Sequence, residues 1–574
     1  MTASDRFDKQ PIFNIADMCA QHGVENVIIS PGSRSAPLTV AFARQPKLRC
    51  RVAMDERAAG FIALGLAQQT QTPVGLVCTS GTAGLNYAPA VTEAFYQRIP
   101  LLVFTADRPP EWIDQQDGQT IHQTNLYGSH LRGSYQLPLD YSHPDALWHL
   151  GRLISEAINT ARWPVPGPVQ INVPLREPLY PPADLAVKPQ AGDKIIRRQP
   201  AQAVLSAGEW GELESVWQSA GRKLILGGLY PSDEPLSEAL ISLQQDRSVA
   251  LLADLTANLH QSAMSLHHWD MALGAKSEAI LETLAPDLVV SFGGQIVSKY
   301  LKQFLRKHRP TEHWYIDPAG QHIDTFQSLT RIIPARPAYF FTHLAERSFS
   351  GSAAYSICWQ TQEAVAQKAL DAFLADVPFG EFRAVYDVMQ ALPAPSHLQL
   401  SNSMPVRYAN FIGLPGQPIQ VNANRGASGI DGVVSTTVGA ALATHKLTTL
   451  ITGDLAFFYD RNALWHNHVP PNLRIIILNN HGGGIFNLID GPGNLPAEEL
   501  TTYFETPHPL TAHNTAADHG CAYFHCAAAG QLQAHLPAFF NPNLGPNLGP
   551  AILEIETDGA VNTEAFRQFK EILA

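Results

Sequence analysis

Short apolar runs that end in small or polar residues recur along the whole chain, and each is followed by a segment with the pattern of a helix. They form three sets, at residues 26–33, 74–84, 101–109 and 169–174, then 223–229, 249–255, 287–294 and 313–318, then 398–403, 419–424, 449–455, 475–480 and 551–557. A short continuous apolar run is typical of a parallel strand covered on both faces. Alternating strands and helices predict parallel sheets, in which ligands bind beyond the carboxyl ends of the strands.

Two weaker stretches divide these sets. Residues 180–203 are rich in proline and charge and lack a clear period, so we interpret them as a linker. A second boundary is expected around residues 332–340, running on to 348–356. The pattern therefore predicts an α/β protein of three successive domains with parallel sheets, at residues 1–190, 200–352 and 353–574.

Composition describes an ordinary globular protein. The chain has 574 residues, which is too long for one core, with 45% hydrophobic and 16% charged residues. Its net charge of −12 argues against nucleic acid or an acidic membrane surface as a partner, because no general positive field would attract either. A small anionic substrate remains compatible with this charge if arginines cluster locally.

Cysteine usage and the absence of long apolar runs bear on the compartment. Six cysteines in so long a chain do not make a disulfide framework, and residues 1–10 do not resemble a signal peptide. No apolar run is long enough to span a bilayer, so we expect a cytoplasmic protein without stable membrane insertion. The stretch "HGCAYFHC" (519–526) matches no common zinc-finger spacing, and we favour a helix that ends at glycine there.

The stretch "IIILNNHGGGIF" (475–486) begins as a buried strand and then continues as two amides and a backbone without side chains. Glycine-rich turns between a strand and a helix are common, and this is one interpretation. The other is that a polar ligand approaches the main chain closely. "HGGG" also occurs in the oxyanion hole of some lipases, but the Gly-x-Ser-x-Gly nucleophile elbow that this requires is absent from the chain.

A second strand end points to a metal. Asp454 closes the strand in "ITGDLAFFYD" (451–460) and stands 26 positions before Asn480, which allows one helix and a return to a neighbouring parallel strand. An aspartate, an asparagine amide oxygen and a backbone carbonyl such as that of Gly482 are hard oxygen ligands. Such a set suits Mg²⁺ that also holds a diphosphate and water. The alternative is that Asp454 only caps the next helix.

"GD" followed about 25 residues later by "NN" resembles the diphosphate-binding motif of thiamine diphosphate (ThDP) enzymes. Leu455 replaces the usual third glycine, as in some branches of that superfamily. The resemblance implies a pyrimidine-binding, a central and a diphosphate-binding domain, in that order. It also implies ThDP with Mg²⁺ or Mn²⁺ as cofactors, with the metal held by Asp454, Asn480 and Gly482. Further cofactor contacts implied by it are Thr82, Ile430, Ile485 and Phe486.

ThDP chemistry needs a carboxylate beside the pyrimidine ring, where it stabilises the imino tautomer that removes the C2 proton. Glu56, at the start of a small-residue helix in residues 51–69, stands at the expected place in the first domain. A glutamate in the first turn is also favoured by the helix dipole alone. Ile430 matches the aliphatic wedge that bends the cofactor, with core packing as its alternative. In the superfamily the acid and the metal site come from different subunits, which implies a homodimer or a dimer of dimers.

Five stretches together closely resemble the synthases that make 2-succinyl-5-enolpyruvyl-6-hydroxy-3-cyclohexene-1-carboxylate (SEPHCHC) in menaquinone biosynthesis. They are "SPGSRSAPL" (30–38), "DERAAGFIALGLA" (55–67), "CTSGTAGLNYAPAVTEA" (78–94), "TADRPPE" (105–111) and "NRGASGIDG" (424–432). The resemblance implies decarboxylation of 2-oxoglutarate and 1,4-addition of the succinyl carbanion to isochorismate. The alternatives are another ThDP-dependent 2-oxoacid decarboxylase, an acetolactate synthase-like carboligase, or a non-catalytic nucleotide-binding protein.

Both of these substrates are dicarboxylates, and planar carboxylates call for arginine forks. Arg34, Arg108, Arg407 and Arg425 stand at or just after predicted strand ends, although any one of them could be a surface salt bridge. By resemblance, the positions that hold isochorismate are Ser33, Arg34, Arg108, Gln119 and Lys299, and those around the succinyl carboxylate are Ser403, Arg407 and Arg425. Gly118 and Tyr300 depart from the family pattern, which puts fine contacts of the isochorismate pocket in doubt.

Overall fold

Three six-stranded sheets form the framework of the protein. The computed structural model describes residues 9–181, 194–262, 265–274, 277–347, 351–488, 491–541 and 549–572, and residues 182–193 of the predicted linker at 180–203 lie outside these ranges. The strand pairs are parallel, and helices alternate with the strands along the chain. The predicted α/β class with three successive parallel sheets is confirmed.

The first sheet has the strand order β2-β1-β3-β4-β6-β5. Its strands are β1 (Asn26–Ile29), β2 (Arg49–Val52), β3 (Val74–Cys78), β4 (Leu101–Asp107), β5 (Gly133–Gln136) and β6 (Val169–Pro174). In the register of the sheet, Ile28 of β1 pairs with Arg51 on one side and with Leu76 on the other. The first strand, β1, thus lies one strand from the edge of the sheet, with β2 on one side of it and the other four strands on the other side.

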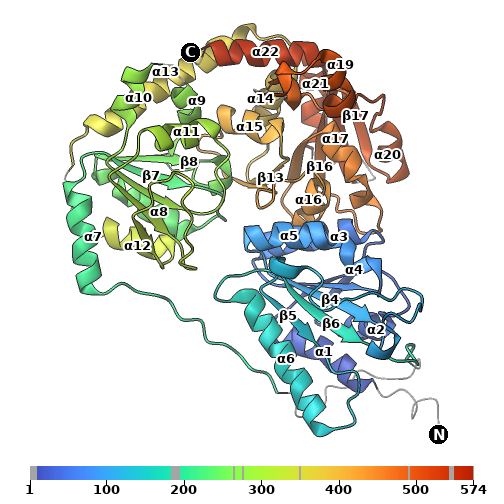
Figure 1. Ribbon diagram of the computed structural model, residues 1–574. Helices are drawn as coiled ribbons and strands as arrows, with labels where there is room; N and C mark the ends of the chain where they lie inside the picture. The colour runs from blue at the N-terminus through green and yellow to red at the C-terminus, as the bar shows by residue number, and fades with distance from the viewer. Residues whose placement is uncertain are drawn as a thin grey trace. The chain divides into compact units, whose positions relative to one another are not determined.

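Helices cover both faces of this sheet. They are α1 (Gln10–Gln21), α2 (Ala36–Arg44), α3 (Glu56–Thr70), α4 (Thr82–Asn86), α5 (Ala88–Gln97) and α6 (Pro144–Arg162). Figure 1 shows α1 and α6 on one face and α3 and α5 on the other. The core beneath α1, α2 and α6 includes Phe42 and Phe104, whose ring centroids are 5.2 Å apart.

The chain divides into two compact units, and the unit that holds the first sheet also includes residues 424–445 and 458–473. In this unit α16 (Val433–Leu442) packs against α3. A Cβ atom on Gly65 would lie 1.9 Å from the carbonyl oxygen of Thr436, and one on Gly439 would lie 2.0 Å from that of Ile62. Both positions require glycine because the two helices meet backbone to backbone.

The second unit holds the other two sheets. The middle sheet has the order β12-β11-β10-β7-β8-β9. Its first strand along the chain, β7, lies at the centre of the sheet, as in doubly wound dinucleotide-binding sheets. Its strands are β7 (Lys223–Gly227), β8 (Val249–Ala253), β9 (Ser265–Leu266), β10 (Leu288–Phe292), β11 (Glu312–Ile316) and β12 (Arg331–Ile333). Its helices are α7 (Ala207–Ser219), α8 (Glu234–Ser242), α9 (Trp269–Gly274), α10 (Glu278–Leu284), α11 (Lys299–Lys307) and α12 (Pro337–Ala345).

The third sheet has the order β14-β13-β15-β16-β18-β17. Its strands are β13 (Ser396–Leu400), β14 (Ile419–Ala423), β15 (Thr448–Gly453), β16 (Leu473–Asn479), β17 (Ala522–Cys526) and β18 (Ala551–Glu556). The edge strand β14 is covered by the middle domain, because the side chain of Asn258 bonds to both backbone groups of Val421, at 2.7 Å and 3.0 Å. A side-chain amide thus closes an open sheet edge in place of another strand.

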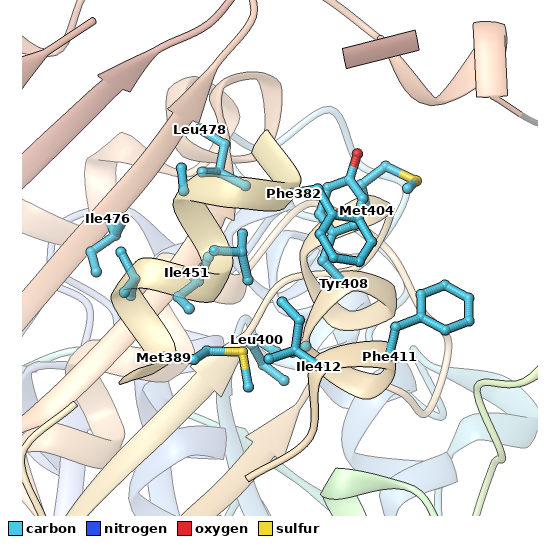
Figure 2. Packing of buried hydrophobic residues seen from close by; sticks show 14 of the residues in the cluster. Phe382, Met389, Leu400, Met404, Tyr408, Phe411, Ile412, Ile451, Ile476 and Leu478 are labelled. Atoms are coloured by element: carbon cyan, nitrogen blue, oxygen red, sulfur yellow. The ribbon is translucent and has the colours of Figure 1, made fainter. Parts of the chain in front are cut away.

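Long and short helices accompany the third sheet. They are α13 (Ala354–Asp376), α14 (Glu381–Ala391), α15 (Met404–Ile412), α17 (Asp454–Tyr459), α18 (Ile485–Leu488), α19 (Ala497–Leu500), α20 (His513–Asp518), α21 (Ala529–Phe539) and α22 (Gly559–Ile572). Figure 2 shows the apolar cluster in which Phe382 and Met389 of α14 meet Tyr408 and Ile412 of α15. Among the described residues, no helix combines the length and the apolar character needed to cross a membrane.

Candidate active site

The predicted metal ligands come together at the carboxyl ends of β15 and β16. Asp454 follows β15 and is only 3% exposed, and Asn480 follows β16. The backbone N–H of Gly482 donates to Oδ2 of Asp454 at 3.0 Å and to Oδ1 of Asn480 at 3.1 Å. The two side-chain oxygens therefore converge on one point of the backbone at the sheet edge.

Asp454 also serves the helix that it begins. Its Oδ1 accepts the N–H of Leu455 at 2.6 Å, while its Oδ2 faces Gly482. Capping and the approach to Asn480 are thus not alternatives, because each uses a different oxygen of the same carboxylate.

Contacts within the chain itself require glycine in the segment 482–484. A Cβ atom on Gly482 would lie 2.8 Å from the carbonyl oxygen of Glu505, and one on Gly483 would lie 2.8 Å from that of Phe504. The N–H of Gly483 donates to the Glu505 carbonyl at 2.7 Å. The bare backbone is therefore needed first for a close approach of two chain segments.

Burial shapes the electrostatics of this edge. It raises the pKa of Asp454, while the neighbouring His508, whose Nε2 lies 3.3 Å from Asp454 Oδ2, lowers it. A buried carboxylate whose charge is penalised in this way gains when a cation binds. In the described ranges no group of three or more His, Cys, Asp or Glu is arranged to hold a metal, so a metal at Asp454 would need amide, carbonyl and non-protein oxygens as its other ligands.

A cavity of about 480 Å³ opens beside Asn480. Its walls are the glycine-rich segment that follows Asn480, the loop with Glu505 and Pro507, and the start of α22. Its volume lies within the range typical of small-molecule sites. Of the two predicted cofactor contacts nearby, Phe486 meets Phe504 at a ring-centroid distance of 5.5 Å, and Ile485 packs against the core.

Glu56 is the first residue of α3 and is partly buried. The helix is capped by Asp55, whose Oδ1 accepts the N–H groups of Arg57 at 2.9 Å and Ala58 at 3.3 Å. Asp55 therefore does the structural work of the first turn. Burial raises the pKa of Glu56, and the Asp55 charge raises it further, against a backbone hydrogen bond that lowers it.

The predicted isochorismate residues of the first unit lie at the carboxyl edge of the first sheet. Arg34 is buried, donates to the Leu175 carbonyl at 2.9 Å and lies 3.4 Å from Glu177. Arg108 donates to the Gly118 carbonyl at 2.7 Å, which brings it to the loop before Gln119. The hydroxyl of Ser33 accepts a hydrogen bond from Tyr180 at 3.1 Å. Thr82 is the first residue of α4, and the preceding Gly81 lies close to Gln119.

Loop 424–432 carries Arg425 and Ile430 and is anchored to α5. The buried carboxylate of Glu93 accepts the N–H groups of Gly426 and Ala427, both at 2.6 Å, and of Ser428 at 3.3 Å. Arg425 is buried, whereas Ile430 remains 39% exposed. The exposure of Ile430 is not that of a core residue, so the alternative of plain core packing is disfavoured.

Two family models match parts of this chain. Residues 13–126 match the family model described as the N-terminal TPP binding domain of thiamine pyrophosphate enzymes, and residues 198–400 match the middle domain of thiamine pyrophosphate. Thiamine pyrophosphate is the same compound as ThDP.

Three relatives all bear the name 2-succinyl-5-enolpyruvyl-6-hydroxy-3-cyclohexene-1-carboxylate synthase. The protein from Cytophaga hutchinsonii is 44% identical over 98% of this chain and 99% of its own. The protein from Desulfotalea psychrophila is 40% identical over 96% of this chain and 98% of its own. The protein from Bacteroides fragilis is 36% identical over 98% of this chain and 99% of its own. The chain belongs to the SEPHCHC synthase family. The resemblance found in the sequence is confirmed, and with it the status of an enzyme that uses ThDP.

In this SEPHCHC synthase family member, Arg407 and Ser298, the residue before Lys299, both interact with Asp270, a buried acid of the middle domain. Arg407 donates to the Ser403 carbonyl, and its charge lowers the pKa of Asp270, which burial raises to about 7. Ser298 caps α11, whose first residue is Lys299, and its hydroxyl donates to Asp270. Asp270 thus contacts the start of α11 and faces Arg407.

Three buried carboxylates that contact the predicted site residues, or the segments that carry them, were not predicted from the sequence. They are Glu93, which holds loop 424–432, Asp270, and Glu381, which accepts a hydrogen bond from Asn480. None of them stands at a strand end. The only signal in the sequence is an acidic residue within an apolar segment, as in "AVTEAF" around Glu93.

Proposed function

We propose that the chain is a transferase that decarboxylates 2-oxoglutarate and adds the remaining succinyl unit to isochorismate, with loss of CO₂ and formation of SEPHCHC. The observation that carries this proposal is the convergence of Asp454 and Asn480 on Gly482, in a chain whose near-full-length relatives bear the name of that synthase. ThDP, when bound, supplies a nucleophilic carbon and an electron sink.

We propose that a divalent metal ion holds the diphosphate of the cofactor. Asp454, Asn480 and the Gly482 carbonyl would hold Mg²⁺ or Mn²⁺ against the diphosphate, and Thr82, Ile430, Ile485 and Phe486 would contact the cofactor. The donor set fits, since it contains oxygen ligands only and leaves places for diphosphate and water.

Glu56 is proposed as the catalytic acid. A carboxyl group must be protonated to donate a hydrogen bond to a ring nitrogen, and burial shifts the pKa of Glu56 upward, toward the protonated form. Asp55 supports this role by capping α3, which leaves the Glu56 side chain available for the cofactor.

The two substrates are proposed to use separate sets of charged groups. Ser33, Arg34, Arg108, Gln119 and Lys299 would hold isochorismate, and Ser403, Arg407 and Arg425 would hold the succinyl carboxylate. Guanidinium groups fix a carboxylate in orientation as well as in place, and such positioning lowers the entropic part of the barrier.

The direct test supplies the purified protein with ThDP and Mg²⁺ and offers 2-oxoglutarate or pyruvate, each with and without isochorismate. We expect CO₂ release from 2-oxoglutarate and an adduct only with isochorismate. Release from pyruvate but not from 2-oxoglutarate would refute the proposal in favour of another ThDP-dependent decarboxylase or an acetolactate synthase-like carboligase.

We further propose a homodimer, or a dimer of dimers, in which Glu56 of one subunit serves the metal site of the other, and domains at 1–190, 200–352 and 353–574. Complementation tests the first part. Glu56→Gln and Asp454→Ala proteins, each strongly impaired alone at limiting Mg²⁺, should regain activity after subunit exchange, because one of the two mixed sites is then intact. No recovery in proven mixed dimers would contradict a shared site.

A further inference from the structure

A buried carboxylate lies directly behind the Asn480 amide. Glu381 is the first residue of α14 and is only 4% exposed. The amide nitrogen of Asn480 donates to its Oε1 at 2.6 Å, and the hydroxyl of Tyr408 donates to its Oε2 at 3.2 Å. The backbone N–H of Glu381 donates to Oδ1 of Asn562 at 2.8 Å, which fixes the start of the helix.

These partners determine which way the Asn480 amide faces. An asparagine presents an oxygen acceptor on one side and an NH₂ donor on the other. The NH₂ group faces Glu381, whose Oε1 accepts from it. The oxygen then points the other way, where it accepts the Gly482 N–H at 3.1 Å. A reversed amide would oppose oxygen to oxygen at one end and N–H to NH₂ at the other.

The surroundings of Glu381 keep it in place. Figure 2 shows Phe382, the next residue, packed beside Tyr408, and their ring centroids are 5.2 Å apart. This apolar cluster replaces water around the carboxylate, so its hydrogen bonds to Asn480 and Tyr408 carry most of its stabilisation. Rotation of Glu381 away from Asn480 would leave a buried carboxyl group without those donors.

We propose that Glu381 is a positioning residue for the metal site: through its hydrogen bond to the amide nitrogen it holds the Asn480 amide with its oxygen toward the cation. The inference rests on the proposed roles of Asp454, Asn480 and Gly482. Groups that orient metal ligands in this way typically change metal affinity by about 10- to 100-fold when they are removed.

The first experiment measures ThDP binding by calorimetry at a series of MgCl₂ concentrations. In Glu381→Gln we expect the Mg²⁺ concentration for half-maximal ThDP binding to rise by about 10- to 100-fold. The chain offers a matched control in Glu554→Gln. Glu554 is an equally buried acid that accepts from Asn479, the neighbouring asparagine, at 2.7 Å, but Asn479 is not a proposed ligand. The Glu554→Gln protein should need the same Mg²⁺ concentration as the wild type for half-maximal ThDP binding.

Asp454→Ala separates failure of this inference from failure of the proposed site. If Asp454→Ala raises the Mg²⁺ requirement and Glu381→Gln does not, Glu381 has no positioning role and the metal site stands. If neither variant changes the requirement, the metal site itself is wrong. An equal shift in Glu381→Gln and Glu554→Gln would indicate a general effect of core polarity and would also overturn the inference.

A donor–acceptor exchange provides a test that loss of stability cannot imitate. Asn480→Asp places a second carboxylate against Glu381 and should raise the Mg²⁺ requirement. Adding Glu381→Gln restores a donor opposite an acceptor, with the two roles reversed. We expect the double variant to bind ThDP at lower Mg²⁺ than Asn480→Asp alone. A double variant no better than that single variant, with both folded by circular dichroism, would refute the proposal.

Discussion

The first and third sheets have the same topology and carry opposite chemistry. Counted from its own first strand, each sheet has the order 2-1-3-4-6-5. The first strand of the first sheet, β1, is followed by Ser33 and Arg34, and the first strand of the third sheet, β13, is followed by Ser403 and Arg407. Beyond that point the equivalent strand ends diverge, so the topology sets where functional groups can stand and the residues decide what they do.

The divergence is clearest at the second, third and fourth strands. After the second strand the first sheet has the acid Glu56, whereas the third has loop 424–432 with Arg425 and Ile430. After the third strand Thr82 corresponds to Asp454. Fourth strands end before Arg108 in one sheet and before Asn480 in the other. On the proposed assignment, the first sheet carries a proton donor and positively charged arginines, and the third sheet carries the oxygen ligands of a metal.

The largest effect should come from the acid of the first sheet. Glu56→Gln should lower kcat by about 10²- to 10⁴-fold, because it removes the proton donor and acceptor, while ThDP and Mg²⁺ binding stays nearly intact. Hydrogen–deuterium exchange at C2 of bound ThDP, followed by NMR, measures the step directly. Equal exchange rates in Glu56→Gln and wild type would contradict this role.

The next effect separates the equivalent arginines. Loss of a charged hydrogen-bond partner from a desolvated carboxylate costs about 2–5 kcal/mol. Arg34→Ala should therefore raise KM for isochorismate strongly and that for 2-oxoglutarate little, and Arg407→Ala should do the reverse and slow decarboxylation. Lysine at either position should restore part of the loss, since a point charge cannot form the fork. Steady-state kinetics with each substrate varied in turn test this. Equal impairment of both substrates by both variants, at unchanged thermal stability, would end the two-pocket assignment.

Asp454→Ala should act on the cofactor rather than on either substrate. Removing one charged ligand should weaken ThDP binding by about 10- to 100-fold at limiting Mg²⁺, from the ~1.5–3 kcal/mol typical of interactions with charged groups. Excess Mg²⁺ should recover part of the affinity. Calorimetry at two Mg²⁺ concentrations distinguishes this from a general loss of structure, which Mg²⁺ would not reverse. Unchanged affinity at limiting Mg²⁺ would mean that "GD" and "NN" do not form a metal site.

A smaller effect concerns stability alone. Gly65→Ala should lower the free energy of unfolding by about 1–3 kcal/mol, since its Cβ atom would overlap the Thr436 carbonyl and push α3 away from α16. Gly530→Ala is the matched control, because a Cβ atom there meets nothing within 4 Å. Thermal or urea unfolding compares the two. A Gly65→Ala protein as stable as Gly530→Ala would show that the helix contact is not tight.

The smallest effect is a pH dependence. Burial raises the pKa of Glu56 in the folded protein, so this group favours folding below the pKa of an unfolded glutamate and loses that contribution as pH rises through its folded pKa. Glu56→Gln should thus be slightly more stable than wild type near neutral pH, and the difference should disappear in acid. Melting temperatures of both proteins from pH 4 to pH 8 measure this, and a constant difference would exclude it.

Sequence patterns predicted the interior strands and the edge strand β14 but missed other edge strands, for a physical reason. β3, β4 and β10 are buried at every position and read as continuous apolar runs. The edge strands β5 and β17, in contrast, mix buried or half-buried positions with exposed ones, as in "GSYQ" and "AYFHC". An edge strand has only one neighbour and less cover, so its composition resembles that of a loop.

The same division holds for the site. Asp454 and Asn480 were predicted because strand ends are where ligands bind in parallel sheets, a rule that needs no knowledge of distant partners. Glu381 and Glu93 could not be predicted in this way. Their partners lie 99 and 333 residues away along the chain, and only the folded chain shows which group each acid meets.

Glu93 also prevents free anions from binding to the backbone of residues 426–428. Three successive backbone N–H groups that point inward form a small anion-binding concavity, of the kind that other proteins use for phosphate or carboxylate. Here a carboxylate of the same chain fills it, through bonds to Gly426, Ala427 and Ser428. A tethered group competes at a high effective concentration, so dissolved carboxylates are excluded from these amides. Around this loop, the selection of acidic small molecules is therefore left to side chains such as Arg425.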